Sequence, residues 1–496
     1  MYSPSRIGLD PHVLSPAHDK RESSVKQASA KTNLSLLQGI RRRAVRQYKS
    51  LPSTESMFKL VMEAGENAKT KPPNAIPKIQ TIQKFAFLLR ENKGFKKYYE
   101  PRAVSLGPIH YGKPKYQLAE KYKLILASEF IKESGKAIDE LYKKVEENIK
   151  ELREYYEEDA TKDYPDKDLA WILFLDGCAI LQYIYCSTTN KFEDLNIKHD
   201  CAVLGQQDLF LLENQLPYRL LKWLMKLSVK KKELKESINI FIENVSDQKS
   251  DWHQAESKKG ESLHSKETPH EQRLSMDGER KPTHLLHLLR TSLLDNPKKV
   301  YNSSQENSKK DWQSYRNVQD LKNAGIWLKP CKTSFLNDIS YIRSCFIGYL
   351  TIPKMKVDNS TGQKFFNLMA FEMCPDFINN YEITSYVCFL NSLMNHADHV
   401  MELRKAGILQ NFLGSDQAVA KIFNELGTNL VPNFNIYSDV RADIDKHHQT
   451  LKSRMFRFYH DYFDSPWSIP AFFGILLELV LTGIQTWFSV KPTSRS

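Results

Sequence analysis

The sequence predicts a mainly α-helical body with a few short β-strands, a disordered basic N-terminal arm and a C-terminal transmembrane helix. Three observations support this fold class: apolar residues recur at helical spacing through the middle of the chain, basic residues crowd the first 50 positions, and residues 467–490 are almost entirely apolar. With 496 residues, 41% of them hydrophobic, the chain is long enough to bury a large core. This composition excludes collagenous, disulfide-framework and wholly disordered proteins.

Residues 1–75 are predicted to form a basic, mostly disordered arm. Nine Lys or Arg residues and one acid, Glu22, lie between positions 20 and 49. Such a stretch is typical of a solvated arm, a targeting signal or a contact with acidic lipids, and the sequence leaves these open. Tyr48 is its one aromatic residue, so we expect no nucleic-acid binding despite the formal net charge of +12.

Residues 76–463 are predicted to form one helical domain, because the prolines of KPPNAIPK at 71–78 stop any helix that precedes it. Within the domain, six apolar residues recur at steps of three or four, which predicts one buried face of a single amphipathic helix. These residues are Ile138, Leu141, Val145, Ile149, Leu152 and Tyr156. Further helical patterns begin at His284 and at Trp312.

Two segments interrupt the helical patterns. Residues 246–282 contain few apolar side chains and cannot bury enough surface to order themselves, so we expect an exposed polar insert. The segment SCFIGYLTIPKMKV at 344–357 is rich in β-branched and aromatic residues and contains Gly and Pro, which predicts a small pair of strands.

The C-terminal apolar run, residues 467–490, predicts a transmembrane helix followed by a short tail at 491–496. A helix of this length spans about 36 Å, whereas the hydrocarbon core of a bilayer is about 30 Å thick. The alternative is a buried core helix. The first 30 residues lack the apolar run of a secretory signal, so we expect a single-pass tail anchor in the plasma membrane, with the body in the cytosol. Basic residues flank the span almost evenly, which leaves the orientation open.

The small and polar side chains of this apolar run fall on one helix face. They are Ala471, Gly474, Glu478, Thr482, Gln485 and Ser489. Small residues let a second helix approach and polar residues hydrogen-bond across the contact. We hypothesise that Gly474, Glu478, Thr482 and Gln485 form a helix-pairing face for a second copy or another membrane protein. The alternative is a lone Glu478 that is tolerated through helix tilt and water.

Motifs for cofactors and metals are weak. The segment from Gly107 to Lys113 has the frame of a phosphate loop, but Pro114 follows where a magnesium-binding hydroxyl is needed, so a turn into a helix near Pro114 is expected. His396 and His399, with Asp398 and Glu402, lack a further convergent metal ligand, and His447 and His448 face different ways on a helix. The seven cysteines show no zinc-ligand spacing. We expect no cofactor, no metal and no catalytic residue, although an enzyme is not excluded.

The segment DLFLLENQLP places five residues of interest in a dense apolar run: Asp208, Glu213, Asn214, Gln215 and Pro217. An acid pair suits general acid/base chemistry, but polar residues before a proline more often satisfy backbone groups of a neighbouring turn inside the core. We interpret them as a structural signature. The alternatives differ in whether Asp176, Asp208 and Glu213 line an open cleft or are buried on backbone donors.

Seven sequence blocks, in order, resemble the plant family known as "domain of unknown function 247". They are YEPRAVSLGPIHYGKP at 99–114, DLFLLENQLPY at 208–218, HLLHLLR at 284–290, LKNAGIWLK at 321–329, NLMAFEMC at 367–374, ITSYVCFLNSL at 383–393 and LTGIQT at 481–486. The resemblance implies a single-pass plant membrane protein with a helical body and no established catalytic residues. Some members in grasses look like pollen-side determinants of self-incompatibility. This chain departs from the family in its basic arm, its polar insert and Glu478.

These observations predict a membrane-anchored recognition or signalling protein whose body binds another protein, with surface loops such as 246–282 setting specificity. The alternative is a tail-anchored enzyme with an unrecognised active site. The expected partners are the lipid bilayer and an unknown protein, in a homo-oligomer or hetero-oligomer joined through the transmembrane helix. Four N-x-Ser/Thr sites would matter only if the body were lumenal or extracellular. They are Asn33, Asn244, Asn302 and Asn359.

Overall fold

The computed structural model describes residues 82–83, 95–246, 282–294, 317–344, 347–428, 432–449 and 468–490. Contacts divide the chain into residues 1–76 and residues 77–496, and every described residue belongs to the second unit. The predicted arm at 1–75, the tail at 491–496, Trp312 and nearly all of the insert at 246–282 lie outside the described residues.

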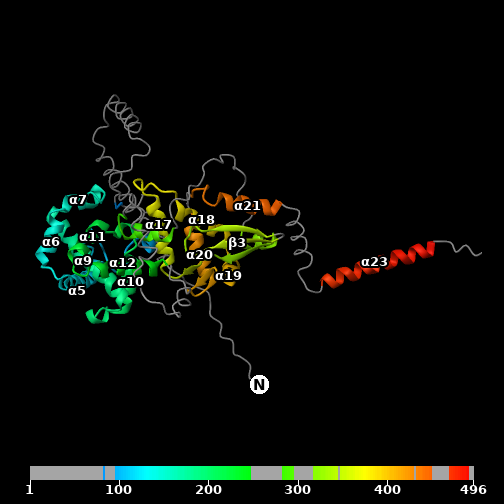
Figure 1. The fold of residues 1–496 in the computed structure, drawn as a ribbon, viewed down its shortest axis with the longest axis horizontal. Coiled ribbons are helices and arrows are strands. Elements are labelled where there is room, and N and C mark those ends of the chain that lie inside the picture. The colour runs from blue at the N-terminus through cyan, green and yellow to red at the C-terminus, as the bar shows by residue number, and fades with distance from the viewer. Residues whose placement is uncertain are drawn as a thin grey trace, which may run out of the picture. The chain divides into compact units, whose positions relative to one another are not determined.

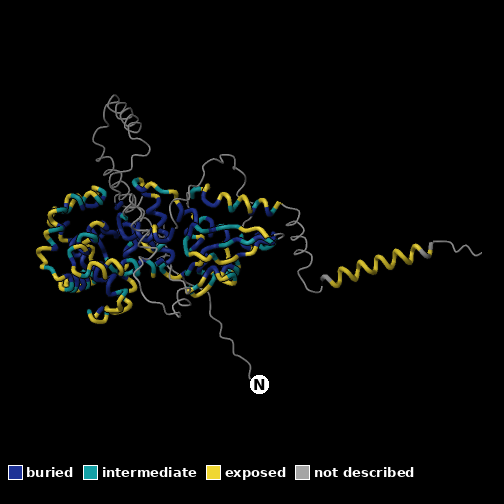
Figure 2. The backbone as a smooth tube through the Cα atoms, viewed as in Figure 1, coloured by how far each residue is buried: buried dark blue, intermediate teal, exposed yellow. Residues whose placement is uncertain are grey.

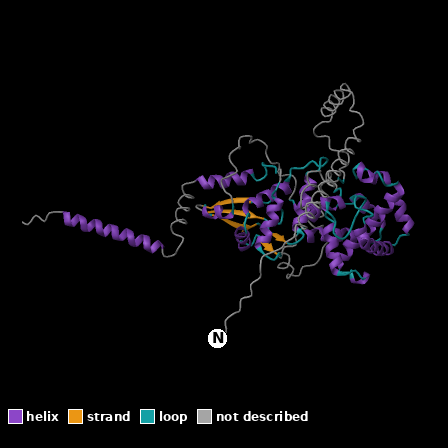
Figure 3. Cartoon of the chain, turned by 180° about the vertical axis from the view of Figure 1, so that it is seen from behind, coloured by secondary structure: helices purple, strands orange, loops and turns teal. Residues whose placement is uncertain are grey.

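The described part is mainly helical with a few short strands, which confirms the predicted fold class (Figure 3). Its first half is built around α9, an apolar helix whose central residues are buried on every side. Helices α5, α6, α11 and α12 pack against α9 (Figure 1). The bounds are α5 Gln117–Ser134, α6 Ile138–Glu146, α9 Asp166–Thr189, α11 Tyr218–Leu227 and α12 Lys231–Val245. A helix that is apolar all round is stable in water only as a core helix, and α9 is one.

Short elements connect these helices. They are α4 Phe95–Tyr99, η1 Pro114–Tyr116, α7 Ile149–Arg153, α8 Glu158–Thr161, η2 Glu193–Leu195, α10 His199–Asp208 and η3 Leu212–Asn214. The chain enters a helix at Pro114, as the sequence predicts, because proline at the first position of a helix loses no hydrogen bond.

The single helix predicted across residues 138–156 is wrong, because the chain forms two helices there, α6 and α7. Asn148 leaves the helical region and its side-chain amide donates to the Lys144 carbonyl, which ends α6. Ile138 is 46% exposed, whereas the other five residues of the predicted face are buried. The apolar spacing survives the break because the short turn keeps both helices against α9.

The described residues of the second half form seven helices and two small sheets. The helices are α15 Leu285–Leu293, α16 Val318–Asn323, α17 Thr361–Glu372, α18 Glu382–Leu393, α19 Ala397–Lys405, α20 Asp416–Leu426 and α21 Ser438–Gln449. Contacts of α15 with both α12 and α17 join the halves, and one continuous cluster of buried apolar residues runs through both (Figure 2). The body therefore has a single core.

The larger sheet has the strand order β1-β3-β2, with β1 parallel and β2 antiparallel to β3. In the smaller sheet β4 lies parallel to β5. The bounds are β1 Ile326–Pro330, β2 Ser340–Ser344, β3 Ile347–Ile352, β4 Met355–Val357 and β5 Leu409–Asn411. The strands predicted within 344–357 exist as β3 and β4, but their predicted pairing with each other is wrong. Pro353 lies between them and lacks an N–H for a ladder, and the two strands pair in different sheets.

The predicted C-terminal helix is α23, Ser468–Val490. Residues Pro470–Trp487 form a span long and apolar enough to cross a membrane, and none of them is buried. Helix α9 also passes this test of length and hydropathy, but 94% of its apolar window is buried inside the body. Burial therefore separates a core helix from a membrane-span candidate of similar composition.

Candidate functional site

Asp208 ends α10 and is completely buried. Its carboxylate accepts backbone N–H groups from Arg102 at 3.0 Å, Ala103 at 2.6 Å and Val104 at 2.9 Å. Burial raises the pKa of the Asp208 carboxyl, and the three N–H donors oppose that rise. All three N–H groups lie in a segment without regular secondary structure. The Asp208 carboxylate therefore supplies the hydrogen-bond acceptors that a neighbouring strand or a helix turn would otherwise supply.

The side-chain amides of Asn214 and Gln215 also form hydrogen bonds with backbone groups. The Asn214 amide accepts the Leu106 N–H at 2.7 Å and donates to the carbonyls of Val104 and Asp208. Gln215 is also buried, and its amide pairs with three backbone groups. It donates to the carbonyls of Leu209 and Leu211, both at 2.7 Å, and accepts the Leu286 N–H at 3.1 Å. Pro217 follows as the N-cap of α11. Together with Asp208, these amides link loop 101–107, the segment 208–215 and the start of α15.

Asp176 anchors the same loop from α9. Its Oδ2 accepts the Gly107 N–H at 2.8 Å, and its Oδ1 lies 2.7 Å from the Lys123 ammonium. Burial raises the pKa of Asp176, with Lys123 opposing the rise. Gly107 has φ +66°, and a Cβ there would lie 3.0 Å from the Tyr156 hydroxyl and 3.1 Å from the Gln215 carbonyl, so only glycine fits.

The hydrogen bond at Gly107 explains the role of the segment whose glycine spacing resembles a phosphate loop. The N–H of Gly107, the first glycine of the frame, already donates to the Asp176 carboxylate. A phosphate loop instead directs its N–H groups at an anionic ligand. The segment from Gly107 to Pro114 is therefore a structural turn.

Glu213 is 2% exposed and lies 3.4 Å from the Nε2 atom of His110. The Nδ1 atom of His110 is 2.7 Å from the ammonium of Lys113, which reaches the surface. A chain of polar groups thus runs from a buried carboxylate to an exposed amine.

Asn367 of α17 extends the network to a third segment, and sequence reasoning missed it. Its amide accepts the Leu212 N–H at 2.9 Å and donates to the Tyr98 and Gln363 carbonyls at 2.8 Å each. The available signal was an amide residue inside the apolar run NLMAFEMC, since buried polar groups nearly always have partners.

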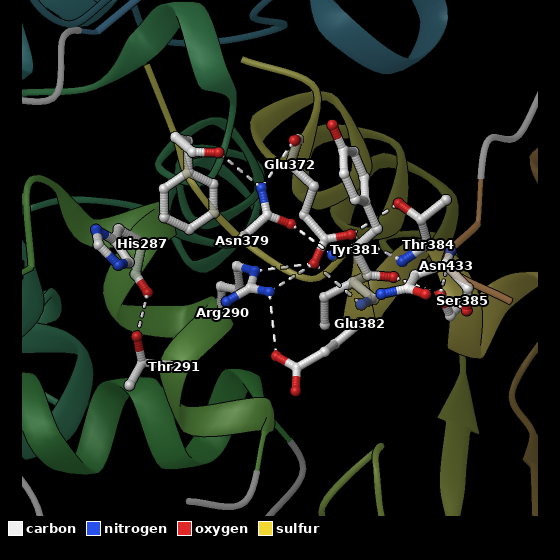
Figure 4. Close-up of polar contacts among 12 residues, drawn as sticks. His287, Arg290, Thr291, Glu372, Asn379, Tyr381, Glu382, Thr384, Ser385 and Asn433 are labelled. Carbon is white, nitrogen blue, oxygen red and sulfur yellow. Dashed lines mark hydrogen bonds and ion pairs between the residues drawn. The ribbon is translucent and has the colours of Figure 1, made fainter. Parts of the chain in front are cut away.

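A second buried network joins α15, α17 and α18 (Figure 4). Arg290 donates to Glu372 Oε1 from Nε at 2.9 Å and from Nη2 at 2.8 Å, and its Nη2 also lies 3.3 Å from Glu382. Glu372 is fully buried and accepts the N–H groups of Ile383 and Thr384 and the Thr384 hydroxyl. An anion at the first turn of α18 is favoured by the helix dipole.

The Arg290 network was also missed from the sequence. Arg290 ends HLLHLLR and Glu372 lies in NLMAFEMC, so both are charged residues in dense apolar runs. Such residues are rarely buried unless they are paired, but the sequence does not name the partner. Burial, together with Glu372, raises the pKa of Glu382, and Arg290 opposes that rise.

The histidine pairs do not assemble a metal site. The His396 and His399 rings lie 5.5 Å apart, and Glu402 is ion-paired with Lys322 and Lys405. Nε2 of His447 lies 3.0 Å from the Ala324 carbonyl. Within the described ranges, no three His, Cys, Asp or Glu residues lie close enough to hold a metal ion.

The face predicted for helix pairing is present on α23. An added Cβ at Gly474 would meet open space, and the Thr482 hydroxyl donates to the Glu478 carbonyl at 2.7 Å. Glu478 and Gln485 are both exposed. The pairing itself stays a prediction.

A cavity of about 140 Å³ lies between α10, the end of α12 and the start of α17. It is lined by Val203, Gln206, Gln207, Phe210, Val245, Asp358, Ser360, Gln363 and Lys364. Small-molecule sites usually enclose about 300–1,000 Å³. Asp176, Asp208 and Glu213 do not line this cavity, and all three are buried in the networks above.

Comparisons with known proteins give the family. Residues 82–481 match DUF247, described as a plant protein of unknown function. The chain belongs to the DUF247 family. UPF0481 protein At3g47200 of Arabidopsis thaliana is 25% identical over 430 residues, which cover 79% of this chain and 83% of the relative. Putative UPF0481 protein At3g02645 of the same plant is 24% identical over 170 residues, covering 34% and 32%. No solved structure matches this DUF247 chain. The resemblance drawn from the sequence blocks is confirmed.

Asp208→Ala is expected to lower the free energy of unfolding by about 3 kcal/mol, because it leaves three partly buried N–H groups without their carboxylate acceptor. The matched control is Asp200→Ala, an exposed residue in the first turn of the same helix, with an expected loss below about 1 kcal/mol. Denaturant unfolding of the detergent-solubilised full chain measures both. Equal losses for the two variants would contradict the structural role of Asp208.

Glu382→Gln tests the second network by its pH dependence. A raised folded-state pKa means that Glu382 favours folding most below its ordinary pKa of 4.5 and progressively less as pH rises through the folded-state value. The unfolding free energy of the native chain, minus that of Glu382→Gln, should therefore fall as pH rises from about 4.5 toward neutrality. Chemical denaturation across this range measures the difference. A difference that rises with pH would show that Arg290 dominates over burial.

Proposed function

We propose that this DUF247 protein is a single-pass, membrane-anchored recognition protein whose helical body binds another protein. The observation that carries the proposal is the use of the buried carboxylates. Asp176, Asp208 and Glu372 accept backbone N–H groups within the core, so they hold the scaffold together instead of lining an open cleft. Because these buried polar groups serve the fold, we expect the body to bind a partner through its surface.

The proposed anchor is α23. Its large apolar side chains are 47–67% exposed, from Ile484 at 47% to Leu479 and Trp487 at 67%. That much contiguous apolar surface is unfavourable in water, at about 25 cal/mol per Å², and a bilayer removes the cost. We place the anchor in the plasma membrane with the body on the cytosolic side.

The proposed partner surface includes the polar insert. Residues 246–282 begin at the end of α12, where Val245 lines the cavity between α10 and α17. Surface loops tolerate sequence change and carry binding specificity, while the buried networks keep the scaffold constant. Recognition of this kind agrees with the self-incompatibility role that the resemblance implies for some family members in grasses.

One observation favours the alternative, a tail-anchored enzyme. The polar chain from Glu213 through His110 to the exposed Lys113 is the arrangement that a general base and a surface amine would need. The cavity lined by Val203 and Lys364 lies elsewhere and does not include these three residues. The recognition role is therefore the better supported of the two.

The anchor is tested by alkaline carbonate extraction of membranes from plant cells that express the full chain. The intact protein should stay in the pellet, and deletion of residues 468–490 should release it. Glu478→Leu should stay in the pellet but lose cross-linked pairs, because its carboxyl is the polar centre of the proposed pairing face. The control Leu477→Ala, at an apolar position of α23 outside the proposed pairing face, should keep the cross-linked pairs. Release of the intact chain would refute the anchor, and unchanged cross-linking of Glu478→Leu would refute the pairing face.

The same membranes report orientation. Asn359 is exposed in the loop before α17 and is followed by Ser360 and Thr361, so a lumenal body would carry a glycan there. A cytosolic body predicts no difference in mass between the native chain and Asn359→Gln beyond the substitution itself. A glycan that disappears in Asn359→Gln would place the body in the lumen.

Recognition is tested by in-cell chemical cross-linking of the full chain and mass spectrometry of its cross-linked partners. Replacing residues 247–281 by a Gly/Ser linker of equal length should change which proteins are captured. The control, in which an arm segment of equal length is replaced in the same way, should not change them. The same partners after replacement of the insert would show that specificity lies elsewhere, and the absence of any cross-linked partner in all three proteins would refute recognition.

A further inference from the structure

The outer face of the larger sheet carries a row of apolar side chains. Register places Trp327 of β1 and Ile342 of β2 on either side of Tyr349 of β3. Successive residues of a strand point to opposite faces, so these three share one face. Trp327 is 45% exposed and Ile342 is 58% exposed. We call this surface the outer sheet face, formed by residues 327, 329, 340, 342, 344, 347, 349 and 351.

The opposite face of the same sheet is covered. Ile326, Leu350 and Ile352 are fully buried, and Leu328 is 9% exposed. Helix α21 packs against β2, and the centroid of its His447 ring lies 6.1 Å from that of Tyr341, which belongs to the covered face. The exposure of Trp327 and Ile342 is therefore confined to one side of the sheet.

The outer sheet face also carries one positive charge, that of Lys329. Its eight residues contain a lysine and no acid. The Lys329 ammonium lies 3.4 Å from the centroid of the Tyr349 ring. Lys322 of α16 lies 5.9 Å from the Trp327 ring and is paired with Glu402. A Trp and an Ile beside a Lys is the composition of a surface that enters a membrane interface and attracts anionic headgroups.

The connection to α23 limits how far this sheet can lie from the bilayer. His447, in the last turn of α21, lies 3.0 Å from the Ala324 carbonyl, two residues before β1 begins. Residues 450–467 then lead to α23. A chain of that length reaches at most about 60 Å. Once α23 is inserted, the outer sheet face is held within reach of the lipid surface.

We propose that the outer sheet face docks on the surface of a bilayer that contains anionic lipid. Trp327 and Ile342 enter the interface between headgroups and acyl chains, and Lys329 contacts the headgroup phosphates and carboxylates. This inference rests on the proposed anchor, because tethering by α23 makes a weak surface contact intramolecular. Docking of this face does not involve the cavity beside Val245, because none of the residues that line the cavity belongs to the larger sheet.

The chain supplies a matched control surface. Helix α5 also exposes aliphatic side chains, with Leu118 at 61% and Ile125 at 42%. These two residues lie on a different element, in the first half of the body. Substitutions there remove a similar apolar area without touching the outer sheet face.

The test is hydrogen exchange of the full chain in nanodiscs that hold one copy each, made of phosphatidylcholine alone or with phosphatidylserine. Amides of β1 and β2 should exchange on the order of tenfold more slowly in discs with phosphatidylserine, and high salt should reverse the effect. Trp327→Ser with Ile342→Ser should remove the slowing, as should Lys329→Glu. Leu118→Ser with Ile125→Ser should keep it. Equal unfolding midpoints in detergent show that all variants fold.

The outcomes separate the docking from the anchor. If α23 is protected in the discs but β1 and β2 exchange equally with both lipids, docking is wrong and the anchor stands. If α23 exchanges freely in the discs, both proposals are wrong. Slowing that survives in the Trp327→Ser, Ile342→Ser variant would also overturn the assigned face, because the protection would then come from another contact.

Discussion

The fold depends on side chains that pair with the backbone of irregular segments. The loop 101–107 runs from the exposed Arg102 to the buried Gly107 without forming a helix or a strand, so its N–H groups have no secondary-structure partner. Asp208, Asn214 and Asp176 supply the missing acceptors. Each buried N–H left unpaired would cost about 1–3 kcal/mol, a large fraction of the stability of a typical domain. Asn367 and the Arg290 pair with Glu372 extend the same solution to α17 and α18. These residues tie together segments that lie far apart in the sequence, so the packing of both halves rests on them.

This constraint also shapes what the protein can do. Carboxylates that hold buried backbone in place are not free to bind substrate or to transfer protons in a cleft. Variation that leaves the protein folded must therefore fall outside the networks, on loops and on exposed faces. Among the described residues, two such surfaces are the cavity beside Val245 and the outer sheet face around Trp327. We propose that the cavity and the insert serve a partner protein and that the sheet face serves the bilayer, with α23 as the proposed anchor.

Local patterns in the sequence predicted the fold class, the helix after Pro114 and the C-terminal apolar helix, because each depends on neighbouring residues alone. The polar residues of 208–217 were singled out for the same reason, since charged and amide groups stand out in an apolar run. Patterns failed where the outcome depends on distant partners. The break at Asn148 keeps the apolar spacing intact, so spacing alone could not show it. The pairing of β3 with β1 and β2, and of β4 with β5, depends on strands that lie before and after the predicted segment. Arg290 and Glu372 are separated by 82 positions, and no local pattern links them.

The central claim, that buried side chains hold loop 101–107 in place, is tested most directly by native-state hydrogen exchange at the loop amides. We predict that the N–H groups of Ala103, Val104, Leu106 and Gly107 exchange about as slowly as the central amides of α9, although they lie in a loop. Loop amides without buried acceptors exchange near the rate of unstructured peptide. Exchange of these four amides within about tenfold of that unprotected rate would contradict the claim.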